Sequence, residues 1–129
     1  MGPYVHRELT SKWAVAAGFS PEDAKTIGLA CIDFDRKKWT KPWAHFRLFG
    51  ANVISRLILR SARKRHNQIF LGYAIHAAQD AIGHGWILPF RHRPELDDWN
   101  NTAPEIQERI ERSTINILQS FQQQGNTEP

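Results

Sequence analysis

Apolar residues recur at steps of three and four along most of this chain, from Tyr4 to Phe121. Such spacing gathers side chains on one face of an α-helix, whereas a half-buried strand needs strict alternation of apolar and polar residues. No stretch of the sequence has a convincing strand or hairpin pattern. We therefore predict an all-α fold, a single compact bundle of about five helices.

Proline and capping residues mark where several of these helices begin. Ser20 followed by Pro21 is typical of a helix start, and Pro104 marks the start of the last helix in the same way. The expected helices span residues 4–18, 20–32, 44–65, 67–85 and 102–121. Two intervening segments lack apolar periodicity and are expected to be irregular, 33–42 and 86–101.

The composition is that of one globular domain. The 129 residues are enough for one domain but not comfortably for two, and no linker rich in proline, glycine or serine divides them. Hydrophobic residues make up 41% of the chain and charged residues 23%, which excludes the signature of a disordered protein. We expect a single domain over residues 1–129, with a polar, frayed tail over residues 122–129.

The net charge of +4 gives the surface a mild attraction for phosphate groups. Much of the positive charge is clustered in one segment, in Arg56, Arg60, Arg63, Lys64 and Arg65. This spacing fits the solvated face and the C-terminal end of a helix. It also leaves open a contact with nucleic acid or with an anionic membrane.

Cys31 is the only cysteine, which excludes an intramolecular disulfide and a cysteine-based zinc site. Metal ligands must then come from histidine, aspartate and glutamate. No segment reaches the roughly 18 apolar residues of a membrane span, and the first residues carry charges where a signal peptide needs its apolar core. The sequence favours a cytoplasmic protein with no transmembrane segment, and it does not indicate the oligomeric state.

Three residues with metal-binding side chains lie four positions apart in an otherwise apolar segment: His76, Asp80 and His84. Steps of four keep side chains on nearly one face of a helix, with a drift of roughly 40° per step. A carboxylate and two imidazoles are costly to bury unpaired, and a bound metal removes that cost. The alternative is that the histidines are hydrogen-bonded residues of the core or its rim, with Asp80 orienting one of them.

Further candidate residues lie elsewhere in the chain. A metal site in a helical bundle usually draws ligands from several helices, and the candidates are His6, Asp33, Asp35 and His45. The aspartates could instead cap a helix or form surface ion pairs. Three tryptophans flank the proposed ligands and could contact a lipid or a nucleobase, Trp39, Trp43 and Trp86.

Two segments carry a family resemblance. The run IDFDRKKWTKPWAHF, residues 32–46, resembles the PDYD…HF segment of the zinc-dependent phospholipase C and P1 nuclease superfamily. The run LGYAIHAAQDAIGH, residues 71–84, is similar to the LGxxxHxxxD helix of that superfamily. His6, followed by Leu9 and Thr10, matches in order the first histidine of its first helix. The resemblance covers roughly residues 4–86.

The resemblance implies an all-α fold that holds one to three zinc ions, or another divalent metal, between its helices. It implies a first metal site formed by Asp33, His45, His76 and Asp80. Asp80 would also bridge to a metal shared with His6, and His84 would begin a third site. By the same analogy, Asp33 is a candidate catalytic general base. The implied substrate is a phosphoester, in a phospholipid or a nucleic acid.

The chain departs from the family at its closing HxxxE motif, which is absent, and it has about half the usual length. The candidates for replacing that motif are His92 with Glu95, or Asp97 and Asp98. The leading hypothesis is a phosphoester hydrolase that uses a metal-activated water. The alternative is a non-enzymatic, metal-stabilised helical domain that binds a partner through its basic and aromatic surface. The resembled family is mostly secreted, whereas this sequence favours the cytoplasm.

Overall fold

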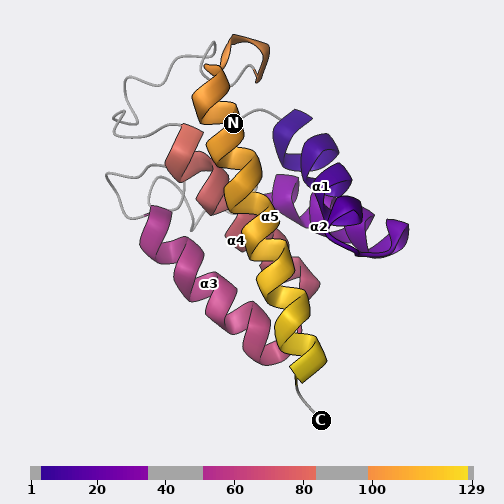
Figure 1. Ribbon diagram of the computed structural model, residues 1–129. Helices are drawn as coiled ribbons and strands as arrows, with labels where there is room; N and C mark the ends of the chain where they lie inside the picture. The colour runs from indigo at the N-terminus through magenta and orange to yellow at the C-terminus, as the bar shows by residue number, and fades with distance from the viewer. Residues whose placement is uncertain (1–3, 35–50, 84–98, 128–129) are drawn as a thin grey trace.

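The computed structural model describes residues 4–34, 51–83 and 99–127, and within them it confirms the predicted all-α fold (Figure 1). A π-helix η1, Tyr4–Leu9, leads directly into α1. Five α-helices follow in order: α1 Thr10–Ala16, α2 Pro21–Asp33, α3 Ala51–Arg65, α4 Gln68–Gly83 and α5 Pro104–Thr127. A short 3-10 helix η7, Trp99–Asn101, precedes α5.

The helix starts follow the chemistry of the sequence. The hydroxyl of Ser20 accepts a hydrogen bond from the backbone N–H of Asp23 at 3.1 Å, and Pro21 occupies the first turn of α2. The Asn67 side chain likewise accepts bonds from the backbone N–H groups of Ile69 and Phe70, at 2.9 and 3.2 Å. These capping bonds fix where α2 and α4 begin.

Two predicted helix ends were wrong. Asp33 is the last residue of α2 rather than the first residue of a loop. The last helix continues to Thr127, so residues 122–127 are helical rather than a frayed tail. Gln122 and Gln123 are good helix formers, and Phe121 packs against Phe19 with ring centroids 6.2 Å apart. That contact anchors the turn from which the helix extends.

Helix α4 lies at the centre of the bundle, in contact with α2, α3 and α5 (Figure 1). Several of its apolar residues are fully buried, among them Leu71, Ala74 and Ile75. The core continues into α5 through Ile110 and Leu118, which are also fully buried. Because three helices cover α4, any polar side chain on its inner faces must find a partner inside the protein.

Glycine lets α4 approach α2 closely. A Cβ atom at Gly72 would lie 2.7 Å from the carbonyl oxygen of Ile27 and 2.9 Å from the backbone nitrogen of Cys31. No other residue type fits so close to backbone atoms. The contact brings the helical turn after Gly72, which carries His76, against the end of α2.

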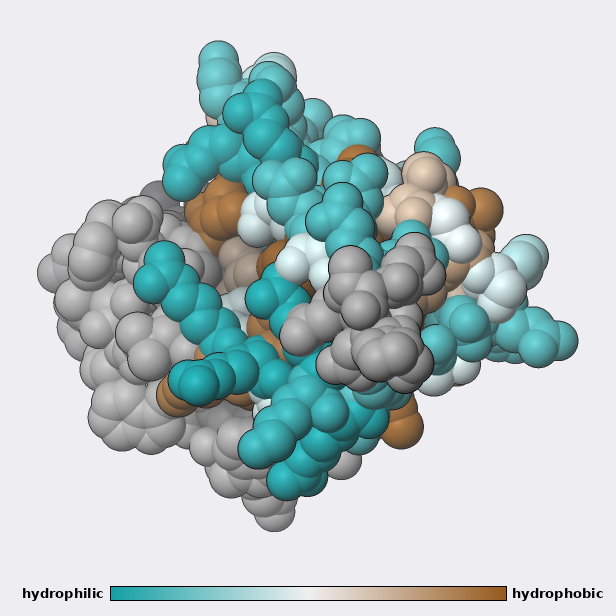
Figure 2. Space-filling view, turned by 60° about the horizontal axis from the view of Figure 1, so that its bottom comes forward, coloured by the Kyte–Doolittle hydropathy of each residue, from teal (hydrophilic) through white to brown (hydrophobic). Residues whose placement is uncertain are grey.

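The basic segment was predicted to be a solvated helix face, and most of it is, whereas Arg63 is half-buried and donates to the hydroxyl of Ser120. Arg56, Arg60 and Lys64 are exposed along α3, and acidic residues are absent from its first turn. Figure 2 shows hydrophilic side chains over much of one side of the described surface, with apolar groups between them. Among the described residues, no helix is both long and apolar enough to cross a membrane.

Candidate functional site

His6 enters the core from the π-helix at the start of the chain and is fully buried. A π-helix is wider than an α-helix, rarely persists beyond one turn and often marks a functional site. Here the hydroxyl of Thr10 donates to the carbonyl of Val5 at 2.9 Å, where the π-helix passes into α1. This local geometry aims the His6 ring at α4.

Helix α4 presents His76, Gln79 and Asp80 to that ring. Positions separated by three and four residues share a helix face, and all three side chains are buried, Asp80 with only 2% exposure. The spacing argument for His76 and Asp80 therefore predicted a shared face correctly. The same spacing places Gln79 on this face, although no metal-ligand pattern in the sequence singles it out.

The carboxylate of Asp80 lies beside the outer edges of the two histidine rings. Its Oδ1 atom is 3.3 Å from Nε2 of His6, and its Oδ2 atom is 2.9 Å from Nε2 of His76. The two imidazole rings stack, with centroids 3.7 Å apart and planes 14° from parallel. Each oxygen of one carboxylate thus faces the outer nitrogen of a different ring.

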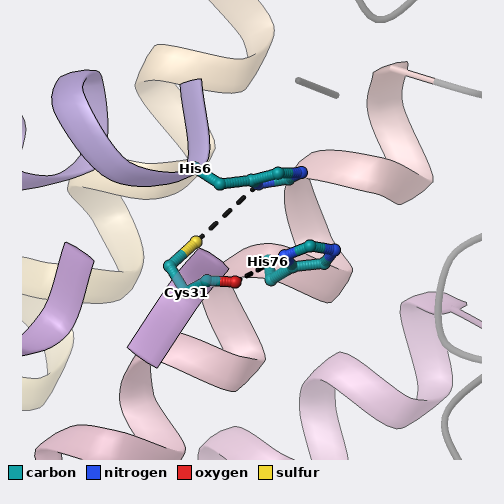
Figure 3. Close-up of side chains that lie close together, drawn as sticks. All are labelled: His6, Cys31 and His76. Carbon is teal, nitrogen blue, oxygen red and sulfur yellow. Dashed lines mark hydrogen bonds between the residues drawn. The ribbon is translucent and has the colours of Figure 1, made fainter. Parts of the chain in front are cut away.

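The inner nitrogens of both rings are held by oxygen acceptors. Nδ1 of His76 lies 2.6 Å from the carbonyl oxygen of Cys31, and Nδ1 of His6 lies 2.8 Å from Oε1 of Gln79. A backbone carbonyl can only accept, so Nδ1 of His76 donates its hydrogen. Figure 3 shows this arrangement: Cys31 lies at one edge of the stacked rings, and the outer nitrogens point away from it.

This is the arrangement found around metal-binding histidines, in which one ring nitrogen donates to a fixed acceptor and the other coordinates. Nε2 of His6 is buried and, among the described residues, has no aligned hydrogen-bond partner, although Oδ1 of Asp80 lies within ion-pair distance. Two ligand atoms about 2.0–2.1 Å from a tetrahedral zinc lie roughly 3.3 Å apart. Both Nε2-to-carboxylate distances are close to that separation.

The electrostatics of the site favour a positive charge near the carboxylate. Burial and the charge of His76 oppose protonation of His6, but Asp80, together with a bond to Cys31, outweighs them and raises the pKa of His6 above 6.5. Burial raises the pKa of the Cys31 thiol, but its bonds and proximity to His6 and His76 outweigh burial and lower it below 9.0. A metal cation near the carboxylate would supply the same kind of positive charge as a proton.

Cys31 belongs to the cluster, which the sequence analysis did not foresee. Its Sγ atom lies 3.8 Å from Nδ1 of His6, and one ligand atom from each of His6, Cys31 and His76 lies within 4.8 Å of the others. This group could hold a metal ion, so a single cysteine is not excluded as a ligand by its number alone. The thiol, however, lies at the edge where Nδ1 of His76 already bonds to a carbonyl. A metal at the outer edge of the rings, toward Asp80, would leave these bonds intact.

The other predicted site residues have different positions. Asp33 is half-buried at the end of α2, where it borders a surface pocket with Arg7 and Tyr73. Within the described part of the chain, it is not a member of the His6, Cys31 and His76 group. The remaining candidates lie outside the described residues: Asp35, Trp39, Trp43, His45, His84, Trp86, His92, Glu95, Asp97 and Asp98.

Comparisons of the chain with protein-family models, curated proteins and solved structures found no match. The function must therefore be inferred from the geometry of the buried cluster and from the motifs of the sequence.

Proposed function

We propose that this chain is a metal-dependent phosphoester hydrolase. Its metal, for which zinc is the leading candidate, is bound by His6, His76 and Asp80. The single observation that carries the proposal is the convergence of the two Nε2 atoms on the Asp80 carboxylate. His6 comes from the start of the chain and His76 and Asp80 from α4, and no packing requirement explains three polar side chains together in an apolar core.

The ligand set fits divalent zinc. Two imidazoles and one carboxylate are a common set for catalytic zinc, which keeps a further position for water or substrate. Asp80 faces one histidine with each oxygen, which is consistent with the bridging role that the family resemblance implies for it. The resemblance adds Asp33, His45 and His84 as further ligands and extends the number of metals to three.

In this proposal, some residues would bind the metal, others would orient its ligands, and one would act as a general base. A bound divalent cation lowers the pKa of water and neutralises the charge of a phosphoester. The backbone carbonyl of Cys31 and the amide of Gln79 hold the rings of His76 and His6 in the orientation that ligation needs. Asp33, by analogy with the family, is the proposed general base. The positive net charge would attract the phosphate.

One observation favours the non-enzymatic alternative. His6 and His76 have no exposed surface, and Asp80 has 2%. A metal at this depth would link η1 to α4 and stabilise the fold whether or not substrate reached it. The two functions share the metal and differ in catalysis, so they need separate measurements.

The first experiment is elemental analysis of the purified protein beside a His76→Ala/Asp80→Ala double variant. A matched control is Arg109→Ala/Glu111→Ala, which changes two exposed residues of α5. We expect at least one equivalent of zinc in the protein and in the control, and none in the double variant. A protein that retains no metal after zinc is supplied and dialysed away would overturn the metal site and with it both functions.

The second experiment measures release of p-nitrophenol from bis(p-nitrophenyl) phosphate by the zinc-loaded protein. We expect hydrolysis that is lost in Asp33→Asn while the melting temperature is retained. If zinc is bound and raises the melting temperature but neither this ester nor a phospholipid or nucleic acid is cleaved, the chain is the metal-stabilised domain instead.

A further inference from the structure

Gln79 is a buried amide that joins three separate elements to the candidate metal site. It has 1% exposure and lies within 3.1 Å of Thr10 in α1, Thr114 in α5 and His6 in η1. We infer that Gln79 is a positioning residue, which fixes the neutral His6 ring in the one tautomer whose Nε2 atom can bind a cation. The relevance to metal depends on the proposed function, but the tautomer itself can be measured without metal.

The first step concerns the two threonine hydroxyls. The hydroxyl of Thr10 donates to the carbonyl of Val5 at 2.9 Å, and that of Thr114 donates to the carbonyl of Ile110 at 2.8 Å. A hydroxyl has one hydrogen, and a carbonyl can only accept. Both hydroxyls have therefore used their hydrogen, and they can offer Gln79 only lone pairs.

The second step fixes the orientation of the amide. The Nε2 atom of Gln79 lies 2.8 Å from Oγ1 of Thr10 and 3.1 Å from Oγ1 of Thr114. Only the NH2 group can donate to two acceptors, so the amide nitrogen must face the threonines. A flipped amide would place its oxygen against two oxygens in the buried core, with no hydrogen between them.

The third step concerns which nitrogen of His6 carries the hydrogen, given this orientation of the Gln79 amide. With its nitrogen turned toward the threonines, Gln79 presents its Oε1 atom to Nδ1 of His6 at 2.8 Å. An amide oxygen can only accept, so Nδ1 of His6 must carry a hydrogen. The thiol of Cys31, 3.6 Å from the same oxygen, can donate there as well, which is consistent with this assignment.

The consequence appears at the opposite edge of the ring. A neutral His6 with its hydrogen on Nδ1 has a lone pair on Nε2, which faces Oδ1 of Asp80 at 3.3 Å. A lone pair against a buried carboxylate is unfavourable unless a cation lies between them. For His76 the backbone carbonyl of Cys31 fixes the tautomer, whereas for His6 three side chains do so and can be changed.

The test is side-chain NMR of 15N-histidine-labelled, metal-free protein, recorded above the pH at which the same spectra show that the His6 ring has become neutral. We expect His6 in the Nδ1–H form in the unsubstituted chain. In Thr10→Val/Thr114→Val the amide loses both acceptors and can turn its NH2 group to His6, so His6 should change to the Nε2–H form. Its new hydrogen would point at Asp80 and block the metal position, and we expect zinc affinity to fall about 10–100-fold.

A second variant distinguishes loss of the hydrogen-bond acceptor from unfolding of the site. Gln79→Met keeps the length of the side chain but removes the acceptor, and it should cause the same tautomer change. The matched control is Thr26→Val, because the hydroxyl of Thr26 also donates to a carbonyl one turn back, at 3.2 Å, but on an exposed face of α2. This control should leave both the tautomer and the zinc affinity unchanged.

The outcomes separate the two proposals. An Nε2–H form of His6 in the unsubstituted chain, or an unchanged tautomer in both folded variants, would overturn the role of Gln79. If the tautomer changes as expected but the unsubstituted protein binds no zinc, the positioning role stands and the proposed metal function fails.

Discussion

The imidazole rings of His6 and His76 stack 3.7 Å apart, with both outer nitrogens directed at the single carboxylate of Asp80. Two imidazolium ions so close would repel each other in a buried site. The Asp80 carboxylate can compensate one positive charge but not two. The site is thus suited to one shared proton, or to one metal cation that Asp80 and two neutral imidazoles ligate together. Because the proton and the metal would compete for the same nitrogens, their competition can be measured.

Replacing Asp80 by asparagine removes the charge that compensates the histidines but keeps the size of the side chain. We expect zinc affinity to fall by at least about 10–100-fold, since loss of a direct ligand should cost no less than loss of a residue that orients one. Competition with a chromophoric chelator measures this. Asp23→Asn is the control, because Asp23 lies in the first turn of α2, away from the site. Equal affinities in the two variants would exclude Asp80 as a ligand.

Stability of the metal-free protein should depend on pH through His6. Its folded pKa is raised above the unfolded value of 6.5, so protonated His6 stabilises the fold fully below 6.5. That contribution is lost as the pH rises through the folded pKa. Urea unfolding in the presence of a chelator, over a series of pH values, measures it.

Two comparisons test this pH dependence. In Asp80→Asn the decline should be weaker, because the carboxylate that raises the pKa of His6 is gone. With zinc the trend should reverse, since ligation requires a deprotonated Nε2 and affinity rises with pH. An identical decline in Asp80→Asn would show that another group is responsible.

Much of the fold could be predicted from local sequence signals. Ser20 and Pro21 predicted the start of α2 because capping chemistry is local. The spacing of His76 and Asp80 predicted their common face because helical periodicity is local as well. The proximity of His6 to His76 and Asp80 could not be derived from spacing, and only the family resemblance suggested it.

The remaining members of the cluster depend on how helices pack, which the sequence does not state directly. Cys31 reaches the histidines because Gly72 lets α4 approach α2. Gln79 orients His6 because α1 and α5 each supply a threonine that has already used its hydroxyl hydrogen. A weak signal existed for Gln79, which lies three positions after His76 on the same helix face.

Cobalt substitution distinguishes the two edges of the histidine pair. If the metal is bound between Nε2 of each ring and Asp80, Cys31 is not a ligand, and the cobalt protein should lack a thiolate-to-cobalt charge-transfer band. Cys31→Ala should then retain its zinc, with a loss of stability of about 1 kcal/mol from the removed buried sulfur. A charge-transfer band that disappears in Cys31→Ala would instead place the metal at the inner edge.

Gly72→Ala tests whether the close approach of α2 and α4 builds the site. The added Cβ atom would lie 2.7 Å from the carbonyl oxygen of Ile27, so the helices must separate, at a cost of about 1–3 kcal/mol. The bond from Nδ1 of His76 to the carbonyl of Cys31 spans this contact and should lengthen, which lowers zinc affinity together with stability. Urea unfolding and zinc competition measure the two effects, with Gln119→Ala at an exposed position of α5 as control. A Gly72→Ala protein as stable as the original, with full zinc affinity, would show that the site does not need this contact.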